Sequence, residues 1–271
     1  MSIKMFAIYN FLKNLIYGFF IGTSVIIPGM SGGTTAILLG IFDEILIALN
    51  NLTKKPVKSI IILIPYAIGG VTGVFALSSP ISYLSENFAF EFSFFIIGIM
   101  IGSSIVFLTK NKLTNKNKPT YIFVGLLIML LFELVSKSIN ISSNNLPFTV
   151  VVGLLSSIAL ILPGISLTNV LIMFGQYSEF IIAIKDFEVR YLGIFFTSVI
   201  VGSFIFIKMF TKIYINHKDK VNLILFGMII ASIKQVYIGF PENNIICIIF
   251  LFVGFAISLL VSFLEKRADF T

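Results

Sequence analysis

Long apolar runs follow one another along the whole chain, and few charged residues interrupt them. A transmembrane helix needs roughly 20 apolar residues, whereas a run of about 10–14 is typical of a buried or re-entrant segment. By this criterion the pattern predicts ten helical elements, at about 6–27, 34–49, 59–79, 91–109, 120–136, 146–162, 168–184, 191–211, 221–237 and 245–263. The runs are continuous rather than alternating, which favours helices over strands. We therefore predict an all-α polytopic membrane protein, with residues 1–271 forming a single integral membrane domain.

An internal repeat relates the two halves of the chain. The stretch Pro28-Gly29-Met30-Ser31 returns 135 residues later as Pro163-Gly164-Ile165-Ser166, and each stretch precedes a short predicted element. Further matched pairs are Gly18 and Gly153, Gly40 and Gly175, and Glu44 and Glu179 at this offset, then Gly73 and Gly202, and Gly98 and Gly227, at an offset of 129. We predict two repeats, at about 6–136 and 146–263, each with a Pro-Gly-broken re-entrant hairpin and three transmembrane helices. Such matched, Gly/Pro-interrupted segments are typical of a transporter binding site.

The distribution of basic residues predicts the orientation of these elements. If each Pro-Gly hairpin enters and leaves on one side, the two termini and the segments 50–58, 110–119 and 208–220 share one face. That face carries 15 of the 19 lysine and arginine residues. Because cytoplasmic loops carry an excess of these residues, both termini are expected in the cytoplasm, and the two repeats have inverted topology. If each Pro-Gly element is instead one broken spanning helix, the repeats are parallel.

Composition narrows the class of protein further. Hydrophobic residues make up 58% of the chain and charged residues 11%, against roughly 45–50% and 25% in soluble proteins. A single cysteine, Cys247, and a single histidine, His217, argue against a disulfide framework, a Cys- or His-based metal site and a Ser/His/Asp triad. We expect neither a metal nor another cofactor. The formal charge of +7 is attributed to cytoplasmic loops, and no nucleic-acid partner is expected.

The Pro-Gly loops are candidate anion sites. A helix start exposes unpaired N–H groups and a partial positive charge, and both favour an anion. Proline ends a helix, glycine permits close backbone approach, and a hydroxyl caps the next helix. The candidate residues are Pro28, Gly29, Ser31, Gly32, Gly33 and Thr34 in the first loop, and Pro163, Gly164, Ser166, Thr168 and Asn169 in the second. A lone Pro-Gly pair is often only a kink, but its duplication favours a paired site suited to a phosphate group.

For each of three ionisable residues, the sequence allows two roles. Lys234 ends a predicted helix on a face poor in lysine, where it either snorkels outward or provides the counter-charge of a bound anion. Glu44 and Glu179 lie toward the far ends of the short elements, where they are either interfacial or take part in coupling to an ion gradient.

These motifs resemble the bacterial polyprenyl-phosphate transporter family, which is implicated in recycling undecaprenyl phosphate across the cytoplasmic membrane. The resemblance rests on the stretches 28–34 and 40–44, on their counterparts 161–166 and 175–177, and on 227–234. It implies a translocase of the bacterial cytoplasmic membrane, without catalytic chemistry, whose partners are a polyprenyl-phosphate lipid and membrane lipids. The loops, with Lys234, would hold the phosphate head during alternating access. One departure is Leu167, where the family usually has glycine, so the two pockets are expected to differ.

Two other functions remain open at the level of sequence. A transporter of a small anion or an amphipathic solute would use the same pocket chemistry. An intramembrane enzyme acting on lipid phosphate would need a nucleophile with a base or a metal, and no His, paired carboxylates or Arg cluster lies near the loops. The sequence therefore favours a transporter over an enzyme.

Overall fold

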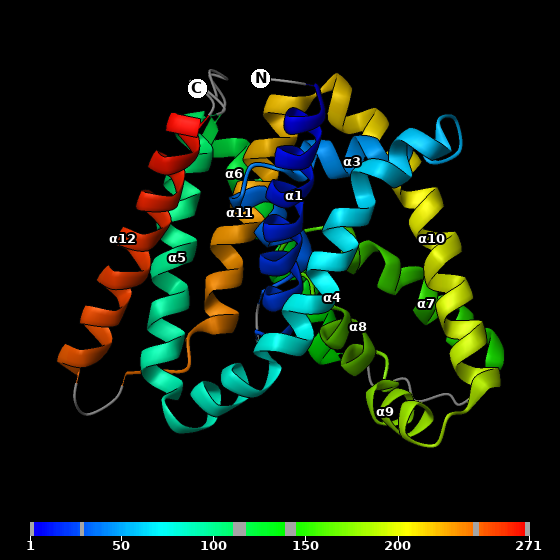
Figure 1. The fold of residues 1–271 in the computed structure, drawn as a ribbon. Helices are drawn as coiled ribbons and strands as arrows, with labels where there is room; N and C mark the ends of the chain where they lie inside the picture. Colours follow the sequence, from blue (N-terminus) through cyan, green and yellow to red (C-terminus); the bar gives the residue numbers. More distant parts are fainter. Residues whose placement is uncertain (1–2, 28–29, 111–117, 139–144, 241–243, 269–271) are drawn as a thin grey trace.

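The structure, a computed structural model, describes residues 3–27, 30–110, 118–138, 145–240 and 244–268. Within these ranges the chain forms twelve helices and no strand, which confirms the all-α prediction (Figure 1). The helices are α1 (Ile3–Ile26), α2 (Gly32–Leu38), α3 (Phe42–Asn50), α4 (Pro56–Asn87), α5 (Ala89–Lys110), α6 (Lys118–Ser138), α7 (Leu146–Ile161), α8 (Leu167–Met173), α9 (Tyr177–Lys185), α10 (Val189–Asn216), α11 (Lys218–Val236) and α12 (Asn244–Ala268).

Each short predicted element is two helices rather than one. Gly40 has φ 70° and ends α2: its N–H donates to the Ile37 carbonyl, and the next N–H, of Ile41, donates to the Ala36 carbonyl. Gly175, with φ 64°, ends α8 through the same pair of bonds. This is the Schellman arrangement, which places glycine in the left-handed region. Helix α9 consequently bends away from α8 by 114°.

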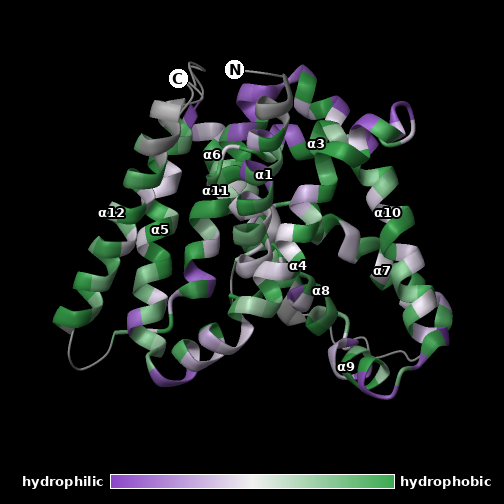
Figure 2. Cartoon of the chain, viewed as in Figure 1, coloured by the Kyte–Doolittle hydropathy of each residue, from purple (hydrophilic) through white to green (hydrophobic). Residues whose placement is uncertain are grey.

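The described residues form a polytopic membrane protein. Four of their helices, α4, α5, α6 and α10, are long and apolar enough to cross a bilayer, and the bent α8–α9 pair makes a fifth candidate if it is one span. Helix α7 and residues 245–261 of α12 are shorter apolar helices. Figure 2 shows a hydrophobic belt across the middle of the molecule, with hydrophilic residues concentrated toward its two ends.

Close packing organises the helices into four pairs: α1 with α4, α7 with α10, α5 with α12, and α6 with α11. Glycines let the paired backbones approach. Gly18 lies against the carbonyl of Tyr66, and Gly153 against that of Phe195, so the α1–α4 and α7–α10 pairs have equivalent contacts. Likewise Gly98 lies against the Leu251 carbonyl, and Gly227 against the Ile122 carbonyl. These partners are related by the 135- and 129-residue offsets of the sequence repeat, so the repeat extends to helix packing.

The lysine-rich segments gather at one end of the molecule. The start of α1, the α3–α4 connection, the α10–α11 junction and the end of α12 lie together (Figure 1). The α4–α5 and α9–α10 connections lie at the opposite end. The described parts of the segments that were predicted to share a face therefore do so.

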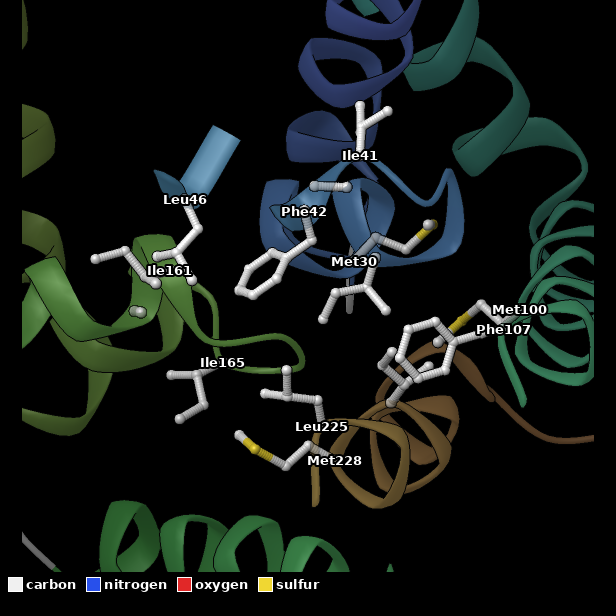
Figure 3. Packing of buried hydrophobic residues seen from close by; sticks show 14 of the residues in the cluster. Met30, Ile41, Phe42, Leu46, Met100, Phe107, Ile161, Ile165, Leu225 and Met228 are labelled. Carbon is white, nitrogen blue, oxygen red and sulfur yellow. The ribbon is translucent and has the colours of Figure 1, made fainter. Parts of the chain in front are cut away.

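The largest hydrophobic core connects the two Pro-Gly loops to α5 and α11. It contains Met30 from the first loop, Ile165 from the second, and Leu225 and Met228 from α11, and these side chains gather in one region with Met100 of α5 nearby (Figure 3). The core therefore holds the two loops in place from within the molecule.

Candidate functional site

The first loop is a capped helix start. Ser31 has extended backbone angles, φ −128° and ψ 156°, and its Oγ accepts a hydrogen bond of 3.2 Å from the N–H of Thr34. The hydroxyls of Ser31 and Thr34 are also hydrogen-bonded, at 2.9 Å. The first intrahelical bond of α2 runs from the N–H of Thr35 to the Ser31 carbonyl. Ser31, rather than Thr34, is thus the N-cap of α2, whereas Pro28 and Gly29 lie outside the described residues.

The second loop repeats this geometry. Ser166, with φ −102° and ψ 150°, accepts a hydrogen bond of 3.2 Å from the N–H of Asn169 and caps α8. Gly164 has φ +81°, a conformation that glycine adopts without the cost a side chain would bring. A Cβ atom at Gly164 would also lie 3.1 Å from the Met228 carbonyl oxygen. Helix α11 therefore fixes the position of this loop.

The two loops are in direct contact. The N–H of Gly164 donates a hydrogen bond of 3.0 Å to Thr34 Oγ1, across 130 residues of sequence. Beside it, a Cβ atom at Gly33 would lie 2.7 Å from the carbonyl oxygen of Ile161, so a side chain there would push the loops apart. Thr34 is fully buried. The structure thus joins the two motifs that the sequence repeat singled out.

Gln235 is a polar residue of this junction that sequence reasoning missed. Its Nε2 donates to the Gly164 carbonyl and its Oε1 accepts from Asn169 Nδ2, both at 3.3 Å. An amide side chain in a membrane helix is costly unless it is hydrogen-bonded. The occurrence of Gln235 in an apolar helix is therefore the feature of the sequence that points to this residue. Gln235 connects α11 to both ends of the second loop.

Lys234 lies next to the junction but is paired with a carboxylate. Its Nζ contacts both oxygens of Glu133, at 2.9 and 2.8 Å. Both residues line a cavity of about 370 Å³ between α6 and α11, together with Met129 and Gln235. This cavity reaches the second loop, because Gln235 bonds to it and Met129 packs against Gly164. Lys234 therefore faces a cavity beside the loop with Glu133 as its present partner.

Glu44 and Glu179 lie away from the loop junction. Glu44 accepts a hydrogen bond of 3.2 Å from Asn14 Nδ2, and Glu179 accepts one of 2.9 Å from Gln176 Nε2. The side-chain oxygen of Gln176, Oε1, in turn accepts a hydrogen bond of 2.8 Å from the Tyr191 hydroxyl. Their helices, α3 and α9, lie toward opposite ends of the molecule (Figure 1). The two carboxylates thus make their hydrogen bonds away from the loop junction.

The predicted site residues of the two loops differ in their solvent accessibility. Ser31, Gly33, Thr34, Pro163 and Gly164 are buried, Gly32, Ser166 and Asn169 are half-buried, and Thr168 is exposed. The buried group holds the loops together, and the second loop is the more open of the two.

Comparisons with known proteins identify the family. The model of the undecaprenyl phosphate translocase-like family matches residues 21–248, which is most of the chain. The chain belongs to this family. A polyprenyl-phosphate transporter of Staphylococcus aureus is 27% identical over 267 residues, which cover 91% of this chain and 94% of that protein. A polyprenyl-phosphate transporter of Vibrio cholerae is 22% identical over 242 residues, which cover 84% and 78%. No solved structure matches the chain.

Membership confirms the resemblance that the Pro-Gly loops indicated. The family is named for translocation, and both relatives are named as transporters. This agrees with the prediction of a transporter rather than an enzyme. The matched region contains both loops and Gln235.

The contact between the loops predicts the effect of one substitution. Thr34→Val keeps nearly the same side-chain shape but removes the acceptor of the Gly164 N–H. A buried donor left without a partner costs about 1–3 kcal/mol, so the thermal unfolding temperature in detergent should fall. Thr72→Val is the matched control, because Thr72 is exposed and donates only to the Gly69 carbonyl of its own helix. Equal unfolding temperatures for the two variants would contradict a stabilising contact between the loops.

Proposed function

We propose that the protein moves a polyprenyl phosphate across a bacterial cytoplasmic membrane, so that this lipid carrier is recycled for cell-envelope synthesis. Membership of the undecaprenyl phosphate translocase-like family supports the substrate class. The hydrogen bond between Thr34 and Gly164 carries the mechanism, because it joins two polar loops from the two halves. Transfer of an unpaired anion into hydrocarbon costs many kcal/mol. A polar junction within the protein lowers that cost for the phosphate head.

The head group binds where the two loops meet. Hydroxyls and amides there exchange their present partners for phosphate oxygens, with which hydrogen bonds are stronger because the acceptor is charged. The bonds exchanged are those from Gly164 to Thr34 and from Asn169 to Gln235. The proposed contact residues are Ser31, Gly32, Thr34, Ser166, Thr168 and Asn169, with Gln235, and the backbone is shaped by Gly33, Pro163 and Gly164.

The two halves act as inverted repeats, each with a re-entrant hairpin. Helices α1 and α7 approach the centre of the molecule from opposite ends (Figure 1), as inverted hairpins would. The equivalent glycine contacts of the α1–α4 and α7–α10 pairs support the repeat itself, whichever way the two halves are oriented. Repeats of this kind transport by rocking one half against the other around a central site.

The two halves are not in equivalent states, which supports alternating access. A cavity of about 400 Å³ lies beside the first loop. On the other side, Val170, Leu225 and Met228 correspond to Thr35, Ile96 and Ile99, and they are packed into the core. The cavity of about 370 Å³ beside the second loop lies between α6 and α11, and these three residues do not line it. Opening the second side while closing the first would exchange these two environments.

An ion pair made by Asp43 of the first repeat, a residue without a charged counterpart in the second, is a candidate gate for this exchange. Asp43 of α3 accepts hydrogen bonds from Tyr214 and Lys218, at the junction of α10 and α11. The residue that corresponds to Asp43 in the second repeat is Ser178, which has no charge. The ion pair therefore ties the halves together at the lysine-rich end, and separation of the halves at that end would require its rupture.

The pairing of Lys234 with Glu133 determines how much of the positive charge of Lys234 is available to the phosphate. We expect Lys234→Gln to weaken the binding of undecaprenyl phosphate and Glu133→Gln to strengthen it, because the second change frees the ammonium for phosphate. Exposed ion pairs contribute about 0.2–1 kcal/mol, which corresponds to changes of about 1.4- to fivefold. Binding to protein in nanodiscs measures both. If the two variants change affinity in the same direction, Lys234 is not a counter-charge of the phosphate.

The orientation follows from the lysine-rich end, which we place in the cytoplasm together with both termini. Single-cysteine variants Asn87→Cys and Asn216→Cys test this in a Cys247→Ser background, since the native cysteine is buried. An impermeant thiol reagent should label Asn87→Cys in intact cells, and Asn216→Cys only after permeabilisation. The reverse pattern would invert the proposed topology.

The loops themselves are tested by transport. Ser31→Ala combined with Ser166→Ala should reduce the movement of undecaprenyl phosphate across proteoliposomes at least about tenfold, since loss of a hydrogen bond to a charged group costs about 1.5–3 kcal/mol. Unfolding temperature reports whether the variant stays folded. Ser78→Ala is the control, because the Ser78 hydroxyl bonds within its own helix. Wild-type transport of inorganic phosphate or sulfate, without transport of the lipid, would favour the small-anion alternative.

A further inference from the structure

A long apolar cavity lies between two of the packed helix pairs, α1–α4 and α5–α12, and beside α2. Its volume of about 400 Å³ falls within the range of roughly 300–1,000 Å³ that is usual for ligand sites. Its lining residues on α5 run from Phe92 to Val106, which is about 21 Å of helix at 1.5 Å per residue. The cavity is therefore an elongated slot that follows the helices.

The lining chemistry suits a hydrocarbon chain. None of the residues that line the cavity is charged, and all but five are apolar. The five polar residues are Thr23, Ser24, Thr35, Ser103 and Ser258. Thr23 and Ser24 donate to carbonyls of their own helix, at 2.8 and 2.7 Å. Ser103 and Ser258 are hydrogen-bonded to each other at 2.7 Å. These four hydroxyls are satisfied within the protein and present little polarity to an occupant.

Thr35 differs from the other four. Its side-chain oxygen is buried and has no hydrogen-bond partner among the described residues, and the residue is only 7% exposed. A buried hydroxyl without a partner is costly unless a ligand satisfies it. Thr35 directly follows Thr34, which contacts the second loop. The unpaired hydroxyl therefore stands where the apolar cavity meets the loop junction.

We propose that this cavity holds the isoprenoid chain of the transported lipid, and that Thr35 hydrogen-bonds the phosphate end of that chain. This inference rests on the proposed function, which supplies a lipid with one anionic head and a long hydrocarbon tail. Met30 of the first loop and, at the end of α2, Leu38 and Leu39 line the cavity. Head and tail are thereby bound by neighbouring parts of one site. The repeat-equivalent of Thr35 is Val170, so this feature belongs to the first half alone.

Filling the cavity tests the tail site. Ile99 lines it, whereas Ile105 of the same helix is 46% exposed on the outer surface. We expect Ile99→Trp to weaken binding of undecaprenyl phosphate to protein in nanodiscs at least about tenfold, and Ile105→Trp to leave it unchanged. Binding of dimethylallyl phosphate, which has the same head and one isoprene unit, should be the same in both variants. Unfolding temperatures of Ile99→Trp and Ile105→Trp equal to that of the wild type show that both variants keep the fold.

The hydroxyl is tested separately. Thr35→Val places at this position the residue found at 170, and should weaken both phosphates about tenfold, equivalent to about 1.4 kcal/mol. Thr72→Val on α4 is the control and should have no effect. An unchanged affinity in Thr35→Val would remove Thr35 from the head-group contacts.

The outcomes separate this inference from the proposed function. A wild-type protein that binds neither phosphate would refute the proposed function. If the wild type binds undecaprenyl phosphate and Ile99→Trp binds it as tightly as Ile105→Trp, only the tail site is refuted. Competition by dioleoyl phosphatidic acid tests the commitment to an isoprenoid chain. Displacement of undecaprenyl phosphate by an equal concentration of that lipid would show that the cavity accepts any lipid chain.

Discussion

The hydrogen bond from the Gly164 N–H to the Thr34 hydroxyl answers the main constraint on this fold. A broken helix in a bilayer leaves polar backbone groups that water does not reach, and each must find a partner within the protein. Here the second loop finds one such partner in the first, because Thr34 Oγ1 accepts the hydrogen bond of the Gly164 N–H, and Gly33 allows close approach to the Ile161 carbonyl. The duplicated loops are thus stable as a pair, and the junction that stabilises them is also the proposed phosphate site.

The repeat provides a nearly symmetric framework with unequal contents. Glycine contacts recur in equivalent helix pairs, as do the serine caps of α2 and α8. The side chains around the loops differ, however. An elongated apolar cavity adjoins the first loop, whereas the cavity beside the second loop is lined in part by Gln235 and the Lys234–Glu133 pair. Under the proposed alternating access, the protein would exchange between two states, and these unequal surroundings would give each state its own affinity for the head and the tail.

Sequence patterns predicted the local features of the molecule and few of its long-range contacts. Apolar runs located the helices, and the serine caps followed from short-range rules that act within a few residues. The glycines at 40 and 175 were noticed as repeated residues, yet their role in splitting each short element depends on a left-handed conformation that the periodicity does not report. Gln235 and Thr35 were missed, and the pairing of Glu133 with Lys234 was not predicted, because these features come from partners on other helices, or from the lack of one.

The position of the bound phosphate tests the central claim most directly. A structure of the protein in nanodiscs, determined with undecaprenyl phosphate present, would locate it. The account predicts phosphate density at the contact between the loops, within hydrogen-bonding distance of side chains from both Ser31–Thr34 and Ser166–Asn169. Phosphate density confined to surface cations such as Arg190, with the Thr34–Gly164 bond intact and no lipid beside it, would contradict it.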